Sequence, residues 1–310
     1  MSRVTVSIDP HVHSEDSYDG HEPVDLILEH AAEIGLDAVV ITDHDVIRES
    51  KRAAETAAEY GLIGIPGVEV STAHGHLLAI GVDRMPPRGE PYAETVRRIH
   101  EQGGVAIVPH PFQRSRHGVR QRDIPTPGSG DGSGGEAPDA EMSGVDAELP
   151  DEDAVDAAGA AAPGAEVDAV EVFNAWLFTG YRNRRARRFA ANHGYPGVAA
   201  SDAHHLQYVG RAFTELTIEG RESVGEVTAD DVLTAIRRGT TTVDGRRAPI
   251  RMAAKHYVGA AGRRSGYYAR TGAARGARAT RRTTLGALTA AKVAALQSVH
   301  RTRRFLSWFA

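Results

Sequence analysis

Histidines and acidic residues recur in this 310-residue sequence at the ends of short apolar runs. His11 and His13 form a His-x-His pair, and side chains two residues apart in an extended segment lie on the same side, so both can bind one cation. Asp202 and His204 repeat that spacing further along the chain. The chain has no cysteine, which excludes disulfides, thiolate zinc sites and thiol nucleophiles. Imidazole and carboxylate ligands suit zinc, manganese or iron.

Other polar residues occupy similar positions. Asp19 lies eight residues beyond His11, in a Ser-Tyr-Asp-Gly turn, and can turn back towards it. The remaining positions at or just after an apolar run are Asp43, His44, Glu69, His110, Glu171 and Asn174. In an α/β barrel the C-terminal ends of the strands share one face, so residues far apart in the sequence would converge there. We therefore predict one metal-binding rim.

The elements that must position these residues alternate between β-branched runs and helical stretches. We predict strands at 4–9, 38–42, 64–70, 77–82, 105–108, 169–173, 197–200 and 213–218, and helices at 23–34, 46–60, 92–102, 181–192 and 229–238. This alternation is typical of a parallel sheet built from βα units. The number of strands favours an α/β barrel over an open doubly wound sheet.

Two regions depart from this pattern. Residues 123–168 contain 13 acidic and no basic residues and are rich in small residues and proline, which predicts a disordered acidic insertion within a domain spanning 1–250. Residues 251–310 hold 13 of the 36 basic residues and no acid, so the formal net charge of −5 combines −18 over residues 1–250 with +13 beyond them. This basic, partly amphipathic extension could bind nucleic acid, lie on an anionic surface or pack on the barrel.

Composition limits the class of protein further. An apolar fraction of 41% is enough for a sizeable core. The sequence contains no apolar window of about 20 residues, which a transmembrane helix needs. Residues 1–17 lack the apolar core of a secretion signal. We therefore expect a cytoplasmic protein without a transmembrane segment.

Several short motifs occur in an order that resembles the PHP superfamily, named for polymerase and histidinol phosphatase domains. They are His11-Val12-His13 with Asp19 in its turn, Thr42-Asp43-His44, the PGVEVS segment around Glu69, the GHLL segment at His76, Pro109-His110-Pro111, and Ser201-Asp202-Ala203-His204. The resemblance runs in order from about residue 7 to 240, apart from the acidic insertion. It implies a distorted (β/α)7 TIM-like barrel that holds two or three divalent metals, Mn, Zn or Fe, and hydrolyses phosphoesters.

The resemblance also implies a role for each motif residue. The first metal would be held by His11, His13, Glu69 and Asp202. Glu69 would bridge to a second metal, held also by His76 and His110. The third metal would be held by Asp19, His44 and His204. At the second metal, His74 is close enough in sequence to compete with His76, although His76 is in the better motif match.

Such a cluster would not need a side-chain nucleophile. Divalent cations neutralise the charge on phosphate oxygens and lower the pKa of bound water, so a hydroxide held at the first metal could attack the phosphorus in line. Four residues are candidates for binding the phosphate, namely Asn174, Arg114, Arg116 and Arg211. The alternatives are a loop cap for Asn174 and exposed surface positions for the arginines. The arginine-rich run at 182–188 is interpreted as solvated or paired with the acidic insertion, with substrate contact as the alternative.

Two functions remain open. The first is hydrolysis of a small phosphomonoester or of the phosphate at the end of a short nucleotide. The second is a non-catalytic PHP scaffold subunit associated with nucleic acid, as expected for relatives that lose metal ligands. All nine ligand positions carry competent side chains, which favours the enzyme.

Overall fold

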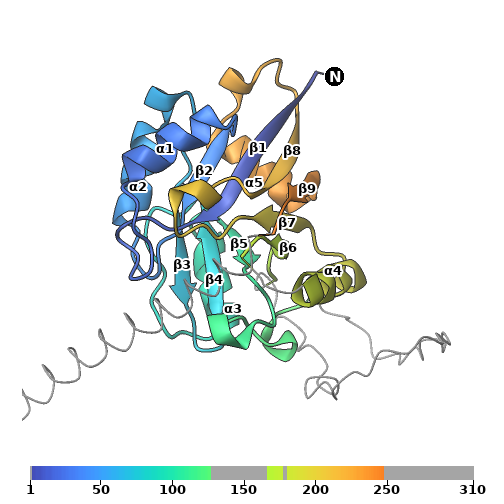
Figure 1. The fold of residues 1–310 in the computed structure, drawn as a ribbon. Helices are drawn as coiled ribbons and strands as arrows, with labels where there is room; N and C mark the ends of the chain where they lie inside the picture. The colour runs from blue at the N-terminus through green and yellow to red at the C-terminus, as the bar shows by residue number, and fades with distance from the viewer. Residues whose placement is uncertain (1, 127–165, 177–179, 248–310) are drawn as a thin grey trace, which may run out of the picture. The chain divides into compact units, whose positions relative to one another are not determined.

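The computed structural model describes residues 2–126, 166–176 and 180–247 (Figure 1). The basic extension at 251–310 and residues 127–165 of the predicted acidic insertion lie outside these residues. The two ends of that insertion are structured, contrary to the prediction of disorder from 123 to 168. Ile124 and Val167 are buried in the core, and the Asp168 carboxylate accepts a hydrogen bond of 2.7 Å from Ala106 N.

Two sheets form the core of the fold. One has the strand order β2-β1-β8-β9 and the other β3-β4-β5-β6-β7. The strands of the first are β1 (Arg3–Val12), β2 (Ala38–Ile41), β8 (Ala212–Glu219) and β9 (Thr241–Gly245). Those of the second are β3 (Gly67–Ser71), β4 (His76–Ile80), β5 (Val105–Val108), β6 (Ala169–Asn174) and β7 (Gly197–Ala200). All eight predicted strands are present, and β9 was not predicted.

Five α-helices accompany the sheets within the described ranges. They are α1 (Val24–Glu33), α2 (Arg48–Thr56), α3 (Tyr92–His100), α4 (Gly180–His193) and α5 (Ala229–Arg238). Each corresponds to a predicted helix, although α2 ends earlier than expected because residues 57–60 tighten into a 3-10 turn. In Figure 1, α1 and α2 lie beside β2, and α4 lies beside β6. None of the helices in the described residues is long and apolar enough to cross a membrane.

Strand direction differs from the predicted parallel barrel. The pairs β1/β2, β5/β6 and β6/β7 are parallel, whereas β1/β8, β3/β4, β4/β5 and β8/β9 are antiparallel. Only residues 72–75 join β3 to β4, and a connection that short permits an antiparallel hairpin but not a parallel crossover. Neither sheet closes on itself within the described residues, so the α/β class is confirmed and a TIM-like barrel is not.

Two isolated bridges set where the candidate residues lie. Val12, at the end of β1, pairs with Ala203 beyond β7, and His44, beyond β2, pairs with Glu69 in β3. Each bridge joins a segment that leaves the first sheet to one that belongs to the second. The carboxyl ends of β1, β2, β3 and β7 therefore meet at one edge, which is the convergence that the sequence predicts.

Candidate metal centre

The end of β1 carries the His-x-His pair into the interior. Both rings are buried, and their Nε2 atoms lie 3.1 Å apart. The backbone of His13 donates to Ala203 O at 2.9 Å, which fixes the pair beside the segment that follows β7. Two imidazole nitrogens at that separation can share at most one hydrogen. A cation beside them could take a lone pair from both.

Asp202 lies against this pair from the end of β7. Its Oδ1 is 3.7 Å from His11 Nε2 and 3.5 Å from His13 Nε2. The φ angle of Asp202 is 53°, in the left-handed region that few residues other than glycine adopt. Asp9 supports this turn, because its buried carboxylate accepts hydrogen bonds from Ser201 N at 3.0 Å and Gly210 N at 2.8 Å. Burial raises the pKa of Asp9 to about 6.

Glu69 is at the centre of the cluster. Its Oε1 lies 2.7 Å from His76 Nδ1 and 3.0 Å from His110 Nε2. Its Oε2 lies 3.1 Å from His44 Nδ1 and 3.2 Å from His11 Nε2. The two oxygens thus face different sets of imidazoles, which is the placement that a bridging carboxylate requires.

The antiparallel direction of β4 brings His76 to this edge. His76 is the first residue of β4 and pairs in register with Ser71 at the end of β3. Its ring is buried beside Glu69, whereas His74 lies in the exposed part of the turn. The hydroxyl of Tyr92 donates to the backbone oxygen of His76 at 3.2 Å and supports the strand from α3. Of the two histidines that compete in the sequence, the structure brings His76 to the cluster.

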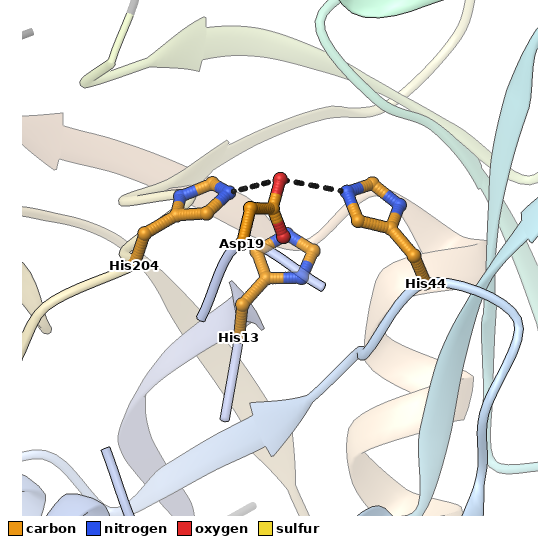
Figure 2. Close-up of side chains that lie close together, drawn as sticks. All are labelled: His13, Asp19, His44 and His204. Atoms are coloured by element: carbon orange, nitrogen blue, oxygen red, sulfur yellow. Dashed lines mark ion pairs between the residues drawn. The ribbon is translucent and has the colours of Figure 1, made fainter. Parts of the chain in front are cut away.

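A second part of the cluster surrounds Asp19 (Figure 2). Its Oδ2 lies 3.4 Å from His44 Nε2 and 3.2 Å from His204 Nε2. The ring of His13 stacks between these two histidines, with ring centroids 4.6 Å and 4.4 Å away. Ser17 Oγ donates to Asp19 Oδ1 at 2.8 Å, which holds the carboxylate in this orientation. The sequence predicts three of these four residues as one group, and the structure adds His13.

The nine predicted ligands therefore lie together but do not separate into the three predicted sets. Ligand atoms within 4.8 Å of one another form four overlapping groups, which are His13/Asp19/His44/His204, His11/Glu69/His110, His11/His13/Asp202 and His44/Glu69/His76. All nine side chains are buried, and the most exposed of them, His44, has 8% of its surface accessible. Three memberships differ from the predicted sets: His13 also belongs to the group around Asp19, His44 also belongs to the group of Glu69 and His76, and His11 groups with His110.

The carboxylates of the cluster are held in their charged form. Burial alone would raise the pKa of Glu69, but the surrounding imidazoles, His44 above all, outweigh it and hold that pKa well below its usual range. Burial would likewise raise the pKa of Asp202, but the charges of Arg116 and His11 hold it well below its usual range. Ionised carboxylates at the interior edge of two sheets need cationic partners, because an uncompensated buried charge is costly.

The histidines divide into two electrostatic types. Burial, aided by the neighbouring charges of His204 and His44, lowers the pKa of His13 to about 3. Burial also lowers the pKa of His76 to about 4, against the attraction of Glu69. At His44 the opposite holds, because the charges of Glu69 and Asp19 overcome burial and raise its pKa to about 9. A divalent cation could replace the proton that these carboxylates attract to His44, and the donor set therefore fits bound metal.

Two of the four predicted phosphate-binding residues reach this cluster. Arg116 is buried, and its guanidinium contacts both oxygens of Asp202, at 3.0 Å from Oδ1 and 2.7 Å from Oδ2. Asn174 Nδ2 donates to Asp202 Oδ2 at 2.9 Å and to Glu171 Oε2 at 2.8 Å. Both side chains therefore hold carboxylates of the site. The interpretation of Arg116 as an exposed surface arginine is wrong.

The other two arginines lie away from the ligands. Arg114 is exposed in the 3-10 turn that follows His110. Arg211 is half-buried immediately before β8, where its Nε donates to Arg247 O at 3.2 Å and its guanidinium lies over Tyr208. Neither contacts a ligand side chain in the described contacts.

Sequence reasoning placed Glu171 near the rim but gave it no role. Its Oε1 accepts a hydrogen bond of 3.0 Å from His11 Nδ1, because a carboxylate oxygen can only accept. Its Oε2 accepts from His110 N at 2.5 Å and from Asn174 Nδ2. The signal was present in the sequence, since Val-Glu-Val occurs both at 68–70 and at 170–172.

Asp43 is a second residue to which no ligand role was given. Its carboxylate accepts hydrogen bonds from both the backbone and the hydroxyl of Ser14, which ties the segment after His13 to the end of β2. Burial raises the pKa of Asp43 to about 6. The Thr-Asp-His motif therefore supplies an internal anchor at Asp43 and a candidate ligand at His44.

The fold and the cluster together define a mixed α/β protein with a buried histidine and carboxylate site of the kind that holds several divalent cations. Residues 9–111 match the sequence model of the PHP domain, and residues 180–241 match that of the PHP-associated C-terminal segment. The chain belongs to the PHP family. Glu171 and Asn174 lie between the two matched segments.

The chain is also similar to a curated protein over part of its length. The chain is 36% identical over 86 residues to the uncharacterized protein MJ1587 of Methanocaldococcus jannaschii, and the match covers 28% of this chain and 50% of that protein. The chain thus matches half the length of that relative.

Solved structures show the same fold at low sequence identity. A two-domain protein from Bacteroides vulgatus, described as containing a predicted PHP-like metal-dependent phosphoesterase, has a TM-score of 0.54 at 19% identity, over 79% of this chain and 66% of the other. PsfC from Pseudomonas syringae has a TM-score of 0.53 at 16% identity, over 84% of this chain and 99% of the other.

Proposed function

We propose that the chain is a metal-dependent phosphoesterase whose cations are held by the nine buried side chains of the cluster. The observation that carries this proposal is the overlap of four potential ligand groups within one buried edge. We infer two or three divalent ions because the ligand atoms form several overlapping groups, and we infer Mn, Zn or Fe because those groups consist of imidazole and carboxylate ligands. The substrate would be a phosphomonoester or the phosphate at a nucleotide end.

The first cation and its water would be held by His11, His13, Glu69 and Asp202, and the second by Glu69, His76 and His110. The third would be held by Asp19, His44 and His204, with His13 as a further neighbour in the structure. Bound cations would neutralise phosphoryl oxygens and lower the pKa of water. Glu69 orients the imidazoles on both of its oxygens, and Asn174 fixes Asp202.

Arg116 would contribute a permanent positive charge beside the phosphoryl group. Its two contacts with Asp202 fix the plane of the guanidinium, and the fork geometry of arginine matches phosphate oxygens as well as carboxylate. The 8% exposure of its side chain leaves little room for competing water. Arg116 is therefore the residue we assign to substrate orientation among the four predicted.

The test is metal removal and restoration. Protein stripped with a chelator should lose turnover of p-nitrophenyl phosphate, and Mn²⁺, Zn²⁺ or Fe²⁺ should restore it, with the bound metal counted by elemental analysis. Activity on the monoester but not on bis(p-nitrophenyl) phosphate would narrow the substrate to phosphomonoesters. Protein that binds two or three ions but hydrolyses neither ester would instead support the scaffold subunit associated with nucleic acid.

A further inference from the structure

The arginines of the described residues fall into two groups. Ten have a carboxylate oxygen within 4.0 Å, and they are Arg3, Arg48, Arg52, Arg88, Arg97, Arg98, Arg116, Arg122, Arg221 and Arg237. Nearly half of the arginines in the described residues are thus paired with a carboxylate. Residues 1–250 carry 23 basic against 41 acidic residues, so carboxylates are in excess.

Most of the arginines without such a partner among the described residues lie in one region. Five of them form what we call the arginine face, which consists of Arg184, Arg187 and Arg188 on α4 together with Arg211 and Arg247. Arg182 and Arg246 are their neighbours in sequence. Elsewhere in the described ranges, only Arg84, Arg114, Arg120 and Arg238 lack a carboxylate partner. Helix α4 itself has five arginines and no acid. Arg185, the remaining one, is not part of the arginine face, because its guanidinium carbon lies 4.5 Å from the Phe112 ring centroid.

The arginine face is continuous in space. Arg184, Arg187 and Arg188 follow the three- and four-residue spacing that places side chains on one helix surface, and all three are exposed. Gly180, the first residue of α4, lies near both Arg184 and Arg247, because a Cβ on it would be 3.5 Å from Arg184 Nη1 and 3.6 Å from Arg247 Nη1. The backbone oxygen of Arg247 in turn accepts the hydrogen bond of Arg211.

Aromatic rings connect this face to the metal centre. The guanidinium carbon of Arg211 lies 5.9 Å from the Tyr208 ring centroid, and Tyr208 is 4.9 Å from Trp176. Trp176 stacks 5.8 Å from His204, a proposed ligand. The rings of Tyr208 and Trp176 therefore lie between Arg211 of the arginine face and the proposed ligand His204.

Unpaired positive charges in such proximity repel one another, and an anion with several charges relieves that repulsion. A small phosphomonoester has one phosphate, which the metal centre and Arg116 would hold, so it would leave the arginine face unused. A nucleic-acid strand places a phosphate at every nucleotide, and arginine forks bind such oxygens bidentately. Tyr181, 40% exposed on the same surface of α4, offers a ring on which a base can stack.

We propose that the arginine face binds the phosphodiester backbone of a nucleic-acid strand whose reacting phosphate lies in the metal centre. This inference rests on the proposed function, which it narrows from phosphoesters in general to nucleic-acid ends. The occupant is identified by its chemistry, a chain of regularly spaced phosphates, and not by base sequence.

The experiment compares two double variants of the full chain. R187A/R188A removes two charges from the arginine face, and R84A/R238A removes two exposed, unpaired charges elsewhere. Binding of a short single-stranded DNA with a 5′ phosphate and a 3′ fluorescein is measured by anisotropy over a range of salt. R187A/R188A should bind about tenfold more weakly, with a salt slope lower by roughly 0.7 per lost phosphate contact, and the control should stay within about twofold of the parent.

The remaining outcomes separate this inference from the proposed function. Hydrolysis of p-nitrophenyl phosphate should be the same in the parent and both variants, because neither arginine pair contacts the ligands. Equal strand binding by both variants would contradict the proposed role of the arginine face, but it would not contradict the proposed phosphoesterase activity. Loss of strand binding only in R187A/R188A, in a parent that hydrolyses no ester under any metal, would support the face and overturn the proposed function.

Discussion

Two strands of this protein carry the same tripeptide, Val-Glu-Val, and place its glutamate in different surroundings. Glu69 in β3 and Glu171 in β6 are both fully buried. Imidazole nitrogens surround Glu69, with four of them within 3.2 Å of its oxygens. Glu171 contacts one imidazole and otherwise accepts hydrogen bonds from a backbone N–H and from the side-chain amide of Asn174.

The difference shows which carboxylate needs a cation. The donors around Glu171 are N–H groups that satisfy its charge without metal. The nitrogens around Glu69 can act as donors only while protonated, and as neutral groups they would turn lone pairs towards the same space. His11 joins the two glutamates, because its Nδ1 donates to Glu171 while its Nε2 faces Glu69. Glu171 therefore selects the tautomer of His11 that leaves Nε2 free to bind.

The largest expected effect tests Glu69 as the shared ligand. Glu69→Gln keeps the shape of the side chain but removes the negative charge that would balance two cations. We expect loss of at least one bound ion per chain and a fall in kcat/KM of about a thousandfold, corresponding to several kcal/mol of transition-state stabilisation. Elemental analysis and turnover of p-nitrophenyl phosphate provide the measurement. Full metal content with normal turnover would show that Glu69 is not a metal ligand.

A smaller effect is expected at the second glutamate. Glu171→Gln retains one oxygen that can accept the His11 hydrogen, so metal should still bind, with an affinity roughly 10–100-fold lower. The measurement is competition against a chelating dye, with Co²⁺ absorption as a second readout of ligand geometry. Glu171→Ala should bind metal more weakly than Glu171→Gln if the role of Glu171 is to orient His11. A loss of bound ions as complete as in Glu69→Gln would indicate that Glu171 is a direct ligand. The proposed difference between the glutamates of β3 and β6 would then be wrong.

The comparison also explains what could be predicted from the sequence. The motifs predict the nine clustered residues and the eight strands because each lies in a local pattern of few residues. Strand direction was not predictable in the same way, because it depends on which distant strands pair. The short turn at 72–75 was the available signal for the β3/β4 hairpin, and its consequence for His76 was missed.

The side chains that contact the candidate ligands were harder still to predict. Arg116 lies six residues beyond His110, and nothing local indicates that its guanidinium would reach Asp202, which is 86 positions away in the sequence. Glu171 was recognisable as polar within an apolar run, but its partners come from β1 and the end of β5. Such contacts depend on how the two sheets meet, and that information is spread over the whole chain.

The third expected effect concerns two histidines in the turn and strand beside Glu69. His76 is buried 2.7 Å from Glu69, and His74, two residues earlier, is exposed. His76→Ala should lower turnover by about a hundredfold, close to 2.7 kcal/mol, and release one ion, whereas His74→Ala should leave both within about twofold. The pair is well matched, since the same atoms are removed from the same hairpin. Equal losses in the two variants would mean that the hairpin, and not the imidazole at the start of β4, supports the second cation.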